Sequence, residues 1–179
     1  MDNEEKVKYL GDQLDTTGKA KTTIEDRKAK GYGIISDITA ITDDIPLGQW
    51  RIPAALLLRK AMLVNGTMFN SECWQGKTIS KDIEVLNKPD EALHRSLIDG
   101  HAKTPCEFLH LEFGTVPFHI IHKGRRANFH QYILKKDKDE LVKRVYSAQQ
   151  SVKTSGDFCE LISKDLEGLK VHMTENHIE

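Results

Sequence analysis

The spacing of apolar residues constrains this fold more than any other feature of the sequence. From residue 19 almost to the end of the chain they recur every three to four positions, as expected for helices that bury one face. Ahead of this region, Lys8-Tyr9-Leu10-Gly11-Asp12 has the pattern of a short strand broken by a turn. We therefore predict a mainly α fold, a helical bundle of about six to seven helices with a short N-terminal strand or hairpin stub.

Two apolar segments are expected to form the first two long helices. Thr22 and Glu25 have the spacing of a capping box, so the first helix should begin at Thr22 and end near Asp44. Its buried stripe would hold four isoleucines, Ile24, Ile34, Ile38 and Ile41. The second helix, from Ile52 to about Phe69, is apolar over much of its circumference, which is typical of a central helix with neighbours on several sides.

Prolines and glycines predict where the following helices begin and end. A third helix from Ser80 should be kinked or split near Lys88, because Pro89 cannot donate a backbone hydrogen bond. The run Thr104-Pro105-Cys106-Glu107 supplies a cap, a proline for the first helical position and an acid, and Gly114 should close this short helix. Later helices are expected over residues 117–135, 138–149 and 157–169.

These patterns divide the chain into three predicted regions. They are the stub at 1–18, an α-helical domain at 19–150, and a C-terminal helix with a tail at 151–179. A Thr154-Ser155-Gly156 hinge marks the second boundary, since such residues favour turns.

Charge and cysteine content exclude several classes of protein. The chain has 26 lysines and arginines against 27 acidic residues, so nucleic-acid binding would need a local patch rather than a whole-chain field. Cys73, Cys106 and Cys159 are odd in number and far apart, which predicts reduced thiols in an intracellular setting, nucleus or cytoplasm. No stretch approaches the roughly 18 uninterrupted apolar residues of a membrane span, so no membrane partner is predicted.

The segment from Thr115 to Lys136 is the local basic patch of the sequence. It has no acidic residue, and its cations are Lys123, Arg125, Arg126, Lys135 and Lys136. Such side chains can follow the phosphates of a duplex, or they can be the solvated face of an ordinary helix, and the sequence leaves both readings open. The interleaved aromatic residues Phe118, Phe129 and Tyr132 could stack on bases, but their helical spacing favours a place in the core.

Histidine and cysteine spacing raises a metal hypothesis. Cys106 and His110 are four residues apart, and His119 and His122 are three apart, so each pair could share a helix face and all four could hold zinc. No Cys-x-x-Cys pair accompanies them. We favour a buried thiol and polar surface histidines, and we predict no metal and no other cofactor.

Several segments in a fixed order resemble a known family. Tyr9-Leu10-Gly11 and a turn precede the helix that begins Thr22-Thr23-Ile24-Glu25-Asp26-Arg27. Further matching segments are Lys30-Gly31-Tyr32-Gly33-Ile34-Ile35, Leu58-Arg59-Lys60-Ala61-Met62, Asn65-Gly66-Thr67-Met68-Phe69-Asn70-Ser71-Glu72, Asp90-Glu91-Ala92-Leu93 and Lys143-Arg144-Val145-Tyr146. This series resembles the region just after the catalytic palm in reverse transcriptases of non-LTR retrotransposons.

The resemblance implies a binding role without catalysis. In that family a Tyr-Leu-Gly hairpin grips the primer, so Tyr9, Leu10 and Gly11 would be grip residues and the helices a thumb that holds an RNA/DNA primer-template. The metal-binding aspartates of the family precede this region, and the partners implied are the duplex and the missing palm and fingers. We predict no catalytic residue.

Other functions stay open beside this one. The chain could be an α-helical protein-interaction module or a relic open reading frame, with apolar surface that a palm once covered. An active polymerase or metal-dependent hydrolase would need paired carboxylates in a strand turn. Asp43-Asp44 lies at a predicted helix end instead, where solvated turn acids are the favoured interpretation.

Overall fold

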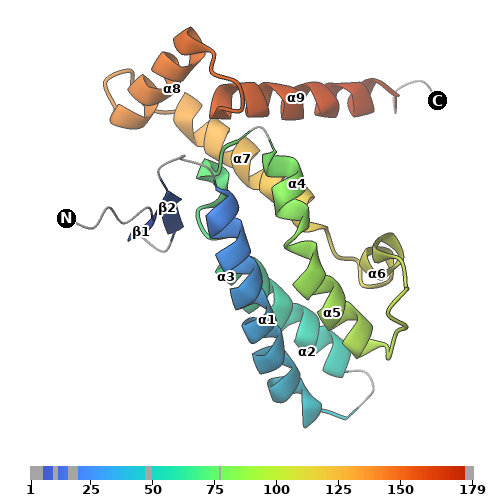
Figure 1. Cartoon of the computed structure of the whole chain (residues 1–179). Coiled ribbons are helices and arrows are strands. Elements are labelled where there is room, and N and C mark those ends of the chain that lie inside the picture. Colours follow the sequence, from blue (N-terminus) through green and yellow to red (C-terminus); the bar gives the residue numbers. More distant parts are fainter. Residues whose placement is uncertain (1–5, 10–11, 16–19, 47–49, 77, 176–179) are drawn as a thin grey trace. The chain divides into compact units, whose positions relative to one another are not determined.

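A computed structural model describes residues 6–9, 12–15, 20–46, 50–76 and 78–175 of the chain (Figure 1). The elements in chain order are β1 (Lys6–Tyr9), β2 (Asp12–Asp15), α1 (Lys21–Asp43), α2 (Arg51–Leu58), a π-helical turn (Arg59–Val64), α3 (Asn65–Thr67), a 3-10 turn (Ser71–Cys73), α4 (Ile79–Glu84), α5 (Asn87–Leu97), α6 (Cys106–Glu112), α7 (Phe118–Leu134), α8 (Leu141–Val152) and α9 (Phe158–Glu175). The predicted mainly α fold is confirmed. The backbones of β1 and β2 pair antiparallel, with Tyr9 opposite Asp12.

Helix α1 begins one residue earlier than the capping-box pattern predicts. Ala20 is the N-cap residue, and its carbonyl oxygen accepts the Ile24 N–H at 2.9 Å, so Thr22 lies inside the first turn and the predicted cap is wrong. The expected buried stripe is also only partly present, because Ile41 is 53% exposed. Thr42 is buried instead, and its hydroxyl donates to the Ile38 carbonyl oxygen at 2.9 Å, which satisfies the buried polar group locally.

The predicted break around Pro89 is present, but it lies earlier in the chain. Helices α4 and α5 are separated by Val85 and Leu86. Pro89 is the third residue of α5, within the first turn, where a backbone N–H has no acceptor inside the helix. A proline is therefore tolerated there without breaking the helix.

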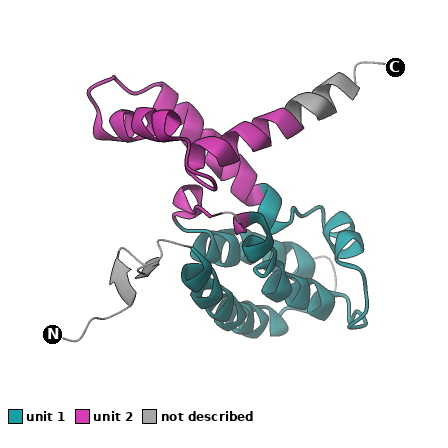
Figure 2. Ribbon diagram, turned by 45° about the horizontal axis from the view of Figure 1, so that its top comes forward, with its two compact units in different colours: residues 1–69, 80–120 teal, residues 70–79, 121–179 magenta. Residues whose placement is uncertain are grey.

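The chain divides into two compact units, coloured separately in Figure 2. Unit 1 comprises residues 1–69 and 80–120, and unit 2 comprises residues 70–79 and 121–179. These units are defined by packing, and the predicted boundaries at residues 18 and 150 stay predictions.

Each unit has a core of its own. In unit 1, α1 packs against α2, α3 and α5, and α5 packs against α6. The approach of α1 to α5 is close at Gly31, where an added Cβ would lie 3.1 Å from Cγ of Pro89. In unit 2, the core is formed by Ile133, Tyr146, Phe158 and Ile162, with Ala127, Phe129, Val142 and Cys159 packed against them. Among the described residues, no helix has the length and apolar character needed to cross a bilayer.

Candidate functional site

The cations of the predicted basic patch differ in exposure. Lys123 and Lys135 of unit 2 are exposed, whereas Arg125 and Lys136 are partly buried. The Lys136 ammonium lies 3.1 Å from a carboxylate oxygen of Glu140 and 4.9 Å from the centre of the Tyr132 ring. Lys123 and Lys135 are therefore the residues of the patch best placed to meet a phosphate.

Arg126 does not lie on the solvated face that the sequence prediction gave it. Its side chain is 1% exposed, and its Nε donates to Oδ2 of Asp165 at 2.9 Å. Burial lowers the pKa of Arg126, and the Asp165 carboxylate opposes that shift. Arg126 follows His122 by four residues and precedes Ile133 by seven, and both of these are buried, so this spacing already placed it on the core face.

Two further cations lie on α8 and were not among the predicted site residues. Lys143 and Arg144 follow the acidic turn at residues 137–140, and Arg144 is exposed. Over residues 121–153 the chain carries nine lysines and arginines against three acidic residues. The exposed cations among them are Lys123, Lys135, Lys138, Arg144 and Lys153, and we name three of these, Lys123, Lys135 and Arg144, the α7–α8 cations.

The grip residues of the resemblance can be placed only in part. Tyr9 ends β1, whereas Leu10 and Gly11 lie outside the described residues. Asp43 and Asp44 lie at the C-terminal end of α1, and the Asp43 carboxylate pairs with Arg51 at 2.5 Å. This agrees with their interpretation as acids at a helix end.

The four residues of the zinc hypothesis do not share one group. Among the described residues, only His110 of the four belongs to a cluster with converging ligand atoms, and its companions are Asp90 and His94. His122 is 2% exposed, and its Nε2 lies 2.8 Å from the Ser71 carbonyl oxygen, which it can bond as a donor. Burial raises the pKa of the Cys106 thiol, as does a hydrogen bond with Glu91, so the protonated form is favoured.

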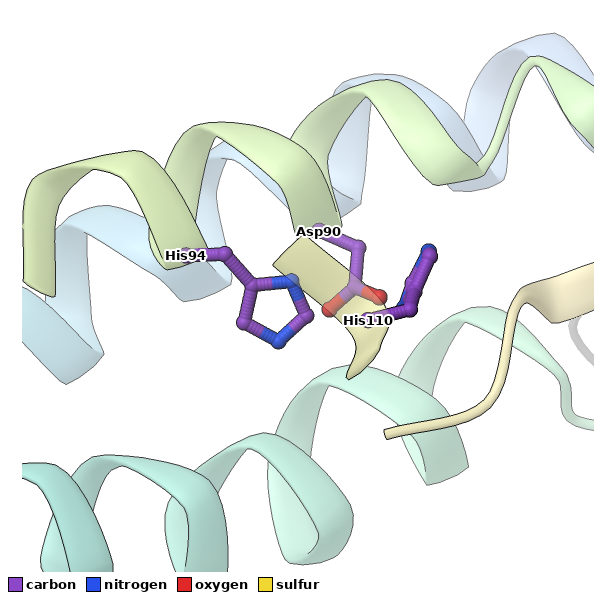
Figure 3. Close-up of side chains that lie close together, drawn as sticks. All are labelled: Asp90, His94 and His110. Carbon is purple, nitrogen blue, oxygen red and sulfur yellow. The ribbon is translucent and has the colours of Figure 1, made fainter. Parts of the chain in front are cut away.

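Asp90, His94 and His110 form a cluster of titratable side chains in unit 1 (Figure 3). Asp90 and His94 lie one turn apart on α5, and His110 projects toward them from α6. One ligand atom from each lies within 4.8 Å of the others, and all three residues are buried. The sequence offered a signal for it in the four-residue spacing of Asp90 and His94.

The end of α6 sets the position of His110. Gly114 has φ of +59°, the Thr115 N–H donates to the His110 carbonyl oxygen at 2.9 Å, and the Gly114 N–H donates to that of Leu111 at 3.2 Å. This is the Schellman pattern that closes a helix. This turn places the Thr115 hydroxyl 2.9 Å from Nδ1 of His110 and 3.3 Å from Nε2 of His94.

Arg59 completes the cluster from the π-helical turn. Its Nε and Nη2 donate to the two oxygens of Asp90, both at 2.6 Å, and Nη2 also reaches the Val116 carbonyl oxygen at 3.3 Å. A bidentate pair of this kind neutralises the buried carboxylate. Helical turns with a π bulge often mark functional positions, and here the turn begins at the arginine that meets Asp90.

The electrostatics of the cluster favour neutral imidazoles beside the ion pair. Burial lowers the pKa of His94 to about 4 and, less strongly, that of His110, while the Asp90 carboxylate opposes both shifts. A divalent cation here would lie next to the Arg59 guanidinium and add charge to a site that is already neutral, which is costly in a buried environment. We therefore assign the cluster to the architecture of unit 1 rather than to a metal centre.

Comparison with known proteins finds no relative of this chain. No protein-family model, no curated protein and no solved structure matches the chain.

Proposed function

We propose that this chain is a thumb-like segment derived from a retroelement reverse transcriptase, and that it holds nucleic-acid duplexes through phosphate contacts. The observation that carries the binding role is the exposure of the α7–α8 cations on a segment where basic residues outnumber acidic ones three to one. The origin rests on the ordered resemblance of the sequence alone. Its palm and fingers would be the protein partners.

Contacts from lysine and arginine to phosphates give affinity without base identity. Each contact releases condensed counterions, so the binding constant falls steeply as salt rises. Binding through so few exposed cations should therefore be weak, independent of sequence and strongest at low salt. The Tyr132 ring is 49% exposed, but the Lys136 ammonium lies over it and the Phe129 ring stacks against it, so we assign it no base contact.

Fluorescence anisotropy of a labelled RNA–DNA primer-template, titrated with the full chain at several salt concentrations, tests the proposal. We expect binding at low salt. A plot of the logarithm of the binding constant against the logarithm of salt concentration should have a slope shallower by about 3 in a variant that combines Lys123→Ala, Lys135→Ala and Arg144→Ala. The matched control combines Lys30→Ala, Lys60→Ala and Lys103→Ala, which removes three exposed charges from unit 1. Equal losses in the two variants would overturn the assignment to α7 and α8.

A second candidate, a protein-interaction module, is favoured by exposed apolar side chains. In unit 1, Leu111 is 81% exposed, Trp50 75% and Leu57 69%. Apolar side chains this accessible often mark protein contacts when they are contiguous. If the folded chain does not bind the duplex in the anisotropy experiment, this candidate is favoured.

A further inference from the structure

A cavity of about 500 Å³ lies in unit 2, where α8 ends and α9 begins. Its walls come from the second half of α8, the turn at residues 153–157 and the first two turns of α9. Binding sites for small molecules have volumes of about 300 to 1,000 Å³. The cavity is therefore large enough for a small organic ligand.

Asp157 brings a carboxylate to this cavity, and one of its two oxygens is unpaired. The residue directly precedes α9 and is 6% exposed. Its Oδ1 accepts the Glu160 N–H at 2.8 Å, which caps the helix. Its Oδ2 is buried and has no hydrogen-bond partner among the described residues. Leaving a buried acceptor unpaired is costly, so capping accounts for one oxygen and leaves the other without a role.

The other charged groups of the lining do not meet this oxygen. Glu160 is already engaged, because its carboxylate accepts hydrogen bonds from the Lys164 ammonium and from the Gly156 N–H, which lower its pKa to about 2. Lys153 is exposed, and its ammonium makes no hydrogen bond to Oδ2 of Asp157. The acceptor that the cavity offers is thus a buried carboxylate oxygen, which a charged N–H donor satisfies best.

The remaining polar lining consists of amides and hydroxyls. Two of these groups donate hydrogen bonds within the protein, Gln150 to the Tyr146 hydroxyl at 3.0 Å and Ser163 to the Cys159 carbonyl oxygen at 2.9 Å. Both keep lone pairs that can accept further hydrogen bonds. Amides and hydroxyls together donate and accept, as the hydroxyl groups of a ligand also do. The amide and hydroxyl residues of the lining are Gln149, Gln150, Thr154, Ser155 and Ser163.

We propose that this cavity binds a small amine that carries several hydroxyl groups, a ligand of the amino-sugar class. Its ammonium group donates to Oδ2 of Asp157, and its hydroxyl groups meet the amides and hydroxyls of the lining. The charged hydrogen bond selects the amine over a neutral sugar of the same shape. This site is separate from the α7–α8 cations, and its test needs no nucleic acid.

Amide NMR of the full chain at neutral pH and physiological salt, titrated with glucosamine, tests the proposal. Glucose is the matched probe, since it has the same ring with a hydroxyl in place of the ammonium group. We expect saturable shift changes confined to residues 146–163 with glucosamine, and binding of glucose that is weaker by roughly ten-fold or more. Equal binding of the two sugars, shift changes centred elsewhere, or none with either sugar would overturn the proposal.

Two variants assign the binding to the cavity. Asp157→Asn keeps an oxygen for the cap of α9 and removes the charge, so it should raise the dissociation constant for glucosamine by roughly ten-fold or more. Ser163→Trp, at an exposed position of the lining, leaves Asp157 in place, fills the cavity and should abolish binding. Asp139→Asn, at an exposed aspartate of unit 2, is the control and should leave binding unchanged. Circular dichroism verifies that each variant retains its helices. Undiminished binding in either cavity variant would contradict the assignment.

Discussion

In both compact units an arginine is buried beside an aspartate, but the two pairs are completed to different degrees. In unit 1, Arg59 donates twice to Asp90 and once more to a backbone carbonyl oxygen. In unit 2, Arg126 donates once to Asp165, and its Nη1 is buried without a hydrogen-bond partner. The comparison shows that neutralising a buried charge and satisfying its donors are separate requirements, since both arginines face a carboxylate but Arg59 makes three hydrogen bonds and Arg126 leaves Nη1 without one.

Acid should produce the largest effect, because each unit contains a buried histidine with a pKa lowered to about 4, His94 in unit 1 and His122 in unit 2. In the unfolded chain both titrate near 6.5. The unfolded state therefore binds more protons as pH falls from about 6.5 to about 4, and stability is lost over that window by about 3 kcal/mol per histidine. Above about pH 6.5 this contribution is fully present.

Urea denaturation at a series of pH values between 7 and 4 measures the loss. The slope of the unfolding free energy against pH reports how many protons are taken up on unfolding. His94→Gln and His122→Gln should each reduce that number by about one, whereas His101→Gln, at an exposed position, should not. A pH dependence unaltered in both buried-site variants would show that other groups cause the acid sensitivity.

Removal of the carboxylate in unit 1 should have the next largest effect. Asp90→Asn leaves the Arg59 guanidinium buried without its counter-charge, which should lower the free energy of unfolding by about 3 to 5 kcal/mol. Denaturant unfolding provides the measurement. The double variant Arg59→Met with Asp90→Leu removes both charges and should recover much of the loss. A double variant no more stable than Asp90→Asn would contradict the ion-pair explanation.

The matching change in unit 2 should cost less. Asp165→Asn also leaves a buried guanidinium without its counter-charge, but it removes one hydrogen bond rather than two, and Asp165 is 9% exposed where Asp90 is fully buried, so we expect a loss at the lower end of the same range, about 3 kcal/mol. The same denaturation experiment compares the two asparagine variants directly. If Asp165→Asn proves more destabilising than Asp90→Asn, the ranking of the two pairs is wrong.

Two glycines of α1 should give the smallest effects, with opposite signs. An added Cβ at Gly33 meets nothing within 4 Å, so Gly33→Ala should stabilise the chain by about 0.5 to 1 kcal/mol through helix propensity. At Gly31 the Cβ would lie 3.1 Å from Pro89, so Gly31→Ala should lose that gain or destabilise. Thermal unfolding measures the stability of both variants. If Gly31→Ala raised the melting temperature as much as Gly33→Ala, this packing of α1 on α5 would be refuted.

The sequence predicted the helical fold and most helix positions because apolar spacing and prolines act locally. The face of Arg126 was recoverable by the same rule, but its charge was given more weight than its spacing. The Arg59–Asp90 pair was not recoverable, since 31 residues separate the partners and no local pattern links them. The π-helical turn at Arg59–Val64 has no signal in composition either, and its buried residues are Arg59, Leu63 and Val64.

The most direct test of the binding role is amide NMR of the full chain during titration with an RNA–DNA duplex at low salt. We expect chemical-shift changes concentrated in α7 and α8, around Lys123, Lys135 and Arg144, with the amides of unit 1 unmoved. Changes concentrated in unit 1, or none at saturating duplex, would contradict the binding role.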